Sequence, residues 1–60
     1  MRVPVDFGDG RKREVEVHHT YAGGKEVYRS RIITNPVTKR PCYVEYDPTV
    51  NEVRVVEVSA

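Results

Sequence analysis

The residues of this chain that have the chemistry for catalysis or metal binding are few, and their spacing argues against both. The 60-residue sequence has one cysteine, Cys42, and two histidines, His18 and His19. Neighbouring residues of a strand point to opposite faces, so the two histidines cannot bind one metal ion from the same strand. A single thiol also excludes an internal disulfide and any zinc site built from several cysteines. We therefore expect no catalytic residues, no metal, no cofactor and no small-molecule substrate.

Cys42 itself fits a buried apolar position. It follows Pro41 at the start of a predicted strand and points to the apolar face of that strand. A free cysteine in such a place behaves as a small hydrophobic side chain. The alternative is a reactive thiol whose pKa is lowered by the neighbouring Lys39 and Arg40.

The cationic residues suggest contact with nucleic acid. Small β-barrels bind nucleic-acid strands with aromatic and cationic side chains gathered on one surface. The candidate residues lie in or beside two predicted turns and are Arg11, Arg13, Lys39 and Arg40, with Tyr43 next to them. Four cations predict a basic rim that binds phosphates weakly and with a shallow salt dependence. The net charge of +1 adds no overall field to attract an anionic partner.

Apolar residues on the expected wet face suggest contact with protein. Under the predicted strand registers, five such residues point away from the core: Val27, Ile33, Tyr43, Val56 and Val58. An apolar group of this size predicts a dimer interface or a partner site. Barrel curvature that buries some of these residues is the alternative. The C-terminal segment Glu52–Ala60 also offers a strand edge for pairing with a second chain.

The elements that position these residues are predicted to be strands. Twelve of the 60 residues are valine and four are tyrosine, whereas leucine and tryptophan are absent. Branched and aromatic side chains favour a sheet, and apolar residues nowhere follow a helical period. Alternating runs bounded by turn residues predict five strands in a meander, which cover Arg2–Phe7, Arg11–His19, Lys25–Thr34, Pro41–Asp47 and Glu52–Val58.

The first and last turns have registers that bring apolar residues together. A three-residue loop over residues 8–10 pairs Val3 with Val15, and its last glycine supplies the left-handed conformation that such loops need. The last turn pairs Tyr46 with Val53. In both hairpins, charged residues of opposite sign meet on the other face.

The middle hairpin is predicted to turn between Ala22 and Gly23. This register pairs Val17 with Tyr28 and places Glu16 opposite an arginine. One apolar rung and two rungs of opposite charge then fall in the same hairpin.

Together, these registers predict a core on one face of a single domain that spans residues 1–60. Eleven side chains form that inner face, with Ser30 among them: Val3, Val5, Phe7, Val15, Val17, Tyr28, Ile32, Val44, Tyr46, Val53 and Val55. The sheet is predicted to curl into a small SH3-like or OB-like barrel, because closure hides strand edges. Pro4 cannot donate to a ladder and so marks an edge strand.

Two short motifs resemble signatures of PKD-type β-sandwich repeats. They are Asp6-Phe7-Gly8-Asp9-Gly10 and His19-Thr20-Tyr21. The resemblance covers roughly residues 5–34 and implies a non-catalytic extracellular module that mediates protein or polysaccharide contacts. The repeats are longer, however, and Val5 stands where they usually have an aromatic residue. We interpret the match as convergence on a tight Asp-Gly turn.

The sequence thus predicts a non-enzymatic β-barrel binding module that acts through protein contact or self-association. Weak nucleic-acid binding through the basic rim is the alternative. We expect a cytoplasmic protein without membrane contact, because the sequence has no apolar run that could span a bilayer and no charged-then-apolar leader after Met1.

Overall fold

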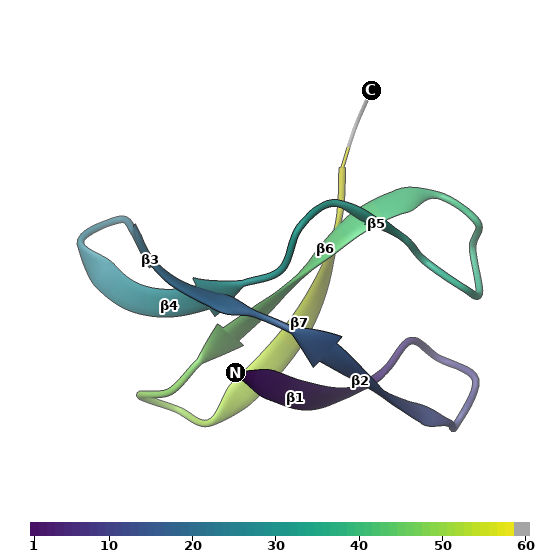
Figure 1. The fold of residues 1–60 in the computed structure, drawn as a ribbon, viewed down its shortest axis with the longest axis horizontal. Coiled ribbons are helices and arrows are strands. Elements are labelled where there is room, and N and C mark those ends of the chain that lie inside the picture. Colours follow the sequence, from purple (N-terminus) through teal and green to yellow (C-terminus); the bar gives the residue numbers. More distant parts are fainter. Residues whose placement is uncertain (59–60) are drawn as a thin grey trace.

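The computed structural model describes residues 1–58 and confirms an all-β fold (Figure 1). The strands are β1 (Arg2–Asp6), β2 (Lys12–Glu16), β3 (His18–Ala22), β4 (Lys25–Arg29), β5 (Ile33–Thr34), β6 (Pro41–Asp47) and β7 (Glu52–Glu57). β1 and β2 form a two-stranded sheet, and the other five strands form an antiparallel sheet that curls into a half-barrel. Within residues 1–58, no helix has the length and apolar character needed to cross a bilayer.

β6 lies at the centre of the five-stranded sheet. It pairs with β7 along one edge, and with β4 and then β5 along the other. Its side chains alternate, so that Cys42, Val44 and Tyr46 share the inner face, which the β1–β2 hairpin covers. The alternate residues of β6 lie on the opposite face, which we call the outer face.

The first and last hairpins have the predicted registers. Val3 lies opposite Val15, and Tyr46 lies opposite Val53. The N–H of Val17 donates to the carbonyl of Met1 at 2.7 Å, so the odd-numbered residues of β1 carry the hydrogen bonds to β2. Pro4 lies between those positions, and its missing N–H therefore costs the hairpin no ladder bond.

The second predicted strand is divided in two at Val17. Residues before Val17 belong to β2 in the small sheet, and residues after it belong to β3 in the large sheet. Val17 is fully buried at this corner, where the chain passes between the sheets. The continuous strand predicted over Arg11–His19 is thus wrong, because period-2 alternation alone does not show where a strand changes sheet.

The turn of the middle hairpin lies one residue further along the chain than predicted, which shifts the pairing of its strands by two residues. Ala22 pairs with Lys25, and Gly23 and Gly24 form the turn with φ angles of +59° and +80°. Two left-handed residues in a two-residue loop are typical of the type I′ turn, which matches the twist of a hairpin. The predicted centre needed Ala22 in a left-handed conformation, which its Cβ disfavours. Tyr28 therefore lies opposite His19, not Val17.

A bulge divides the third predicted strand into β4 and β5. The N–H of Ser30 donates to the carbonyl of Val44 at 2.9 Å, and Ile33 pairs with Cys42. Two residues, 31 and 32, therefore lie opposite the single residue Tyr43, which is the pattern of a β-bulge. The extra residue reverses the alternation, so that Ile33 packs against the core while Ile32 is 60% exposed.

The core forms on the predicted inner face. Buried and partly buried apolar residues make up this cluster: Val3, Val5, Phe7, Val15, Val17, Tyr28, Ile33, Cys42, Val44, Tyr46, Val53 and Val55. Of the eleven predicted residues, only Ile32 is outside the cluster. The predicted surface map is thus correct except where the bulge and the middle turn shift it.

Candidate protein-binding surface

The outer face of β6 carries two carboxylates that are almost fully buried. Glu45 is 8% exposed and Asp47 is 5% exposed. Arg29 donates from Nε to Glu45 Oε2 at 2.8 Å, and Arg54 donates to the other carboxylate oxygen at 3.1 Å. Buried carboxylates need such partners to offset their desolvation. The cross-strand charge pairs of this face thus form a packed layer.

Asp47 is held in the same way at the other end of β6. Lys25 donates to its Oδ2 at 2.8 Å, and the backbone N–H of Thr49 donates to its Oδ1 at 2.9 Å. The hydrogen bond from Lys25, followed by that from Thr49, lowers the pKa of Asp47. Both Lys25 and Arg29 reach across to β6 from either side of Val27 on β4. Val27 lies between them on the same face and is 3% exposed, which we attribute to their aliphatic stems.

Tyr43 is oriented by this ion-pair layer. The guanidinium of Arg29 lies 5.3 Å from the centroid of the Tyr43 ring, within the range of a cation–π contact. The hydrogen bond to Glu45 raises the pKa of Arg29 and keeps its charge fixed above the ring. Tyr43 pairs with Val56 of β7. The aromatic ring therefore lies where the charged layer ends and an apolar region begins.

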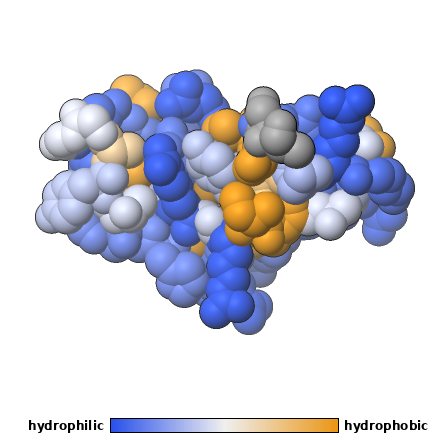
Figure 2. All heavy atoms as spheres, turned by 90° about the horizontal axis from the view of Figure 1, so that it is seen from above, coloured by the Kyte–Doolittle hydropathy of each residue, from blue (hydrophilic) through white to orange (hydrophobic). Residues whose placement is uncertain are grey.

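That apolar region, which we call the outer patch, consists of Ile32, Tyr43, Val56 and Val58. Val58 extends the ladder beyond β7, because its N–H donates to the carbonyl of Pro41 at 3.0 Å, and this register places it on the same face as Val56. Ile32 and Tyr43 border one shallow depression of about 350 Å³. Figure 2 shows apolar atoms exposed near the end of the described chain, with hydrophilic atoms around them.

The structure places the five residues predicted for protein contact in different environments. Tyr43, Val56 and Val58 are half-buried on the outer face. Val27 lies under the ion-pair layer, and Ile33 packs against the core. Val27 faces outward as predicted but is buried, and the predicted outward position of Ile33 is wrong. Sequence reasoning missed Ile32, because only the bulge turns it outward.

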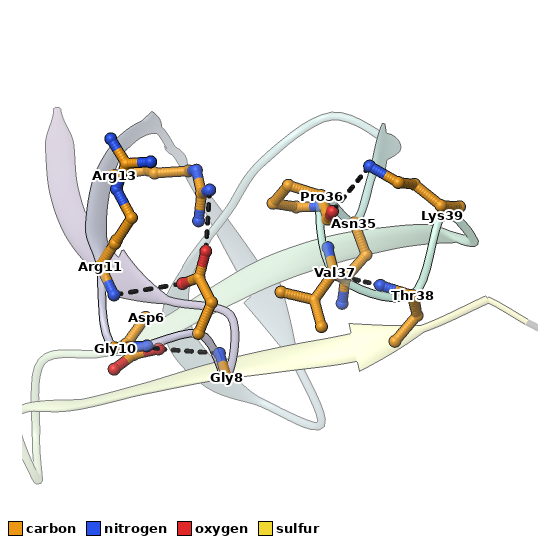
Figure 3. A network of polar contacts seen from close by, with 11 residues as sticks. Asp6, Gly8, Gly10, Arg11, Arg13, Asn35, Pro36, Val37, Thr38 and Lys39 are labelled. Atoms are coloured by element: carbon orange, nitrogen blue, oxygen red, sulfur yellow. Dashed lines mark hydrogen bonds and ion pairs between the residues drawn. The ribbon is translucent and has the colours of Figure 1, made fainter.

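Of the residues predicted as a basic rim, Arg11 and Arg13 lie at the β1–β2 turn and the start of β2, beside the loop that carries Lys39 (Figure 3). Arg40 follows Lys39 in that loop, before β6 begins. Arg13 is paired with Asp9 at 2.9 Å, and Lys39 donates to the carbonyl of Pro36 at 2.9 Å. Arg11 and Arg40 are exposed and have no ion-pair partner among residues 1–58. Two of the four cations are thus already engaged.

Those loops are rigidified by side chains that accept backbone hydrogen bonds. Asp6 accepts from Gly8 and Gly10, while the buried Asn35 accepts from Val37 and Thr38 (Figure 3). The tyrosine assigned to the rim, Tyr43, lies on the outer face beneath Arg29 instead. The structure therefore does not bring the tyrosine and the four cations into one continuous surface.

The residues considered for catalysis or metal binding are placed apart. Cys42 is fully buried, and burial, followed by the charge of Glu57, raises the pKa of its thiol. This is opposite to the direction that a reactive thiol needs. His19 packs edge-on against Tyr28, with ring centroids 5.5 Å apart, whereas His18 lies on the other face. Residues 1–58 contain no group of three or more His, Cys, Asp or Glu arranged to hold a metal ion.

Comparisons of the chain with protein-family models, with curated proteins and with solved structures found no match.

Proposed function

We propose that this chain is a non-catalytic binding module that self-associates, with the outer patch as the contact surface between two copies. The observation that carries this proposal is the uneven cover of the outer face. The ion pairs of Glu45 and Asp47 hold long cationic side chains over one half of that face, as far as the Tyr43 ring. Among residues 1–58, no ion pair holds a cation in the same way over Ile32, Val56 or Val58. An apolar centre with a rim of paired charges is the usual anatomy of a protein interface.

The size of the chain supports a second copy as the partner. A domain of about 60 residues buries a smaller fraction of its unfolded surface than a larger domain does, and oligomerisation is one way to add stability when disulfides and metals are lacking. Tyr43 suits such a contact, because its ring is already held by Arg29 and loses little freedom on binding. A symmetric dimer would place each outer patch against its own equivalent.

Solution mass tests this proposal. Light scattering at tens to hundreds of micromolar is expected to give twice the 6.9 kDa of one chain. Val56→Lys places a charge in the centre of the outer patch and should restore the mass of one chain. Val50→Lys is the matched control, since Val50 is 60% exposed in the turn between β6 and β7 and lies outside the outer patch. A wild-type chain that stays monomeric to millimolar concentration contradicts the proposal.

Nucleic-acid binding is a second candidate, supported by Arg11 and Arg40, the two residues of the predicted basic rim whose side chains are exposed and have no partner among residues 1–58. Two phosphate contacts predict weak binding with a shallow salt dependence. Titration of a fluorescent single strand at low salt tests it. Loss of binding in the Arg11→Ala, Arg40→Ala double variant, with binding retained in Lys39→Ala, supports this candidate, and an unbound strand at low salt excludes it.

A further inference from the structure

A hollow of about 550 Å³ lies between β1 and β7, at the end of the molecule that carries the two loops of Figure 3. The two strands contact each other, yet they belong to different sheets and are not joined by a ladder. They run at an angle to each other (Figure 1). The floor of the hollow is apolar and comes from Val5, Phe7, Val53 and Val55.

One wall of the hollow is an open strand edge. The hydrogen bond from Val58 to Pro41 fixes which residues of β7 bond to β6: those with even numbers. The N–H and C=O groups of Val53, Val55 and Glu57 therefore point away from β6, towards the hollow. β1 does not complete the ladder, and its facing edge contains Pro4, which has no N–H to donate.

The part of the hollow where β1 and β7 end is acidic. Asp6 and Glu57 both line it, and neither has a cationic partner among residues 1–58. The carboxylate of Asp6 accepts hydrogen bonds from the backbone N–H groups of Gly8 and Gly10. The carboxylate of Glu57 accepts one from the Thr38 hydroxyl at 3.0 Å. The residues within 1–58 that line the hollow include no basic side chain. A ligand for this place therefore combines apolar side chains with a positive charge at one end.

We infer that the hollow binds an extended peptide segment of a partner protein, which adds to β7 as an antiparallel strand. Because the added strand runs antiparallel to β7, its residues lie opposite Glu57, Val55 and Val53 in that order from its N-terminus. The side chains of these three peptide residues all point to the inner face. The geometry thus specifies the pattern basic-x-apolar-x-apolar from the N-terminus of the peptide. This site is separate from the outer patch and does not require self-association.

The test uses two labelled peptides, acetyl-Lys-Thr-Val-Thr-Val-Thr-amide and the same peptide with Glu in place of Lys. Fluorescence anisotropy with the wild-type chain is expected to show binding of the lysine peptide at least about tenfold tighter than of the glutamate peptide. Amide hydrogen exchange supplies the second readout. Bound peptide should slow exchange at Val53, Val55 and Glu57 and leave Arg54 and Val56 unchanged, since only the first group faces the hollow.

Charge reversal distinguishes a local contact from a general charge effect. Glu57→Lys should invert the preference between the two peptides. Glu52→Lys makes the same change in net charge at the far end of β7 and should preserve the preference within about twofold. Equal binding of both peptides to the wild-type chain, equal effects of the two variants, or slowed exchange confined to other residues overturns the inference.

The outcome is independent of the proposed self-association. The same titration with the Val56→Lys chain should give unchanged peptide affinity. If the hollow does not bind peptide, the solution mass of the wild-type chain is unaffected. If the chain is monomeric, the wild-type protein still binds the lysine peptide.

Discussion

The residues on the two faces of β6 are buried by different kinds of contact. On the inner face, Cys42 and Val44 are fully buried by packing against the β1–β2 hairpin. On the outer face, Glu45 and Asp47 are buried to almost the same degree, although no second layer of the described residues lies over them. Arginine and lysine side chains from the neighbouring strands provide their cover.

This difference explains why the outer patch is not covered by ion-paired side chains. Ion-paired cations can lie over a sheet only where carboxylates hold them in place, as Glu45 holds Arg29 and Arg54. Beyond Tyr43, towards Val56 and Val58, no described carboxylate on this face provides such an anchor. The outer patch begins where the ion-pair layer ends, and we expect it to need another chain for cover.

The largest effect should come from the inner face. Val44→Ala removes two carbon atoms from a site with no exposed surface and should lower the free energy of unfolding by about 2 kcal/mol. Val56→Ala makes the same change on the half-buried outer face and should cost less than about 1 kcal/mol in the monomer. Urea denaturation of both variants measures the difference, with each chain kept well below micromolar concentration so that it is monomeric. Equal losses contradict the distinction between the two faces.

The ion-pair layer should contribute the next largest effect. Glu45→Gln keeps the shape of the side chain but removes the charge that both arginines contact, and we expect a loss of about 1 kcal/mol in the free energy of unfolding. Glu52→Gln, at an exposed position of β7, should change it by less than about 0.5 kcal/mol. The contacts of Glu45 add nothing to stability if the two variants unfold at the same urea concentration.

Much of this arrangement could be predicted from the sequence. Alternation placed Val44 and Tyr46 on the inner face, and two of the three turns left one register that matched apolar residues. The middle turn was wrong because charge matching favoured a centre at Ala22, while backbone conformation favours the Gly23-Gly24 pair. At a tight turn, the steric cost of a left-handed alanine outweighs cross-strand pairs of exposed charges.

The candidate site could be predicted less completely. Tyr43 and Val56 were found because they face each other in a hairpin whose register was correct. Ile32 was missed and Ile33 misplaced, because Ser-Arg-Ile-Ile is compatible with either alternation and only long-range pairing with β6 reveals the bulge. The hollow between β1 and β7 depends on the angle between two strands of different sheets. Local patterns of residues do not contain that angle.

The smallest expected effect at neutral pH lies at the Asp47–Lys25 ion pair, and acid should reveal it. Because the contacts with Lys25 and Thr49 lower the pKa of Asp47 in the fold, the stabilisation is complete above the ordinary carboxyl pKa of 3.8. It is lost as the pH falls below that value, through the lowered pKa. Asp47→Asn and Lys25→Met should therefore both flatten the loss of stability between about pH 4 and pH 2, and the double variant should flatten it no further than Asp47→Asn alone. Circular dichroism followed through acid unfolding gives the comparison. Curves for Asp47→Asn and the wild-type chain that lose stability in parallel over this range would show that the Lys25 contact does not persist in solution, and that the cover of Val27 has another origin.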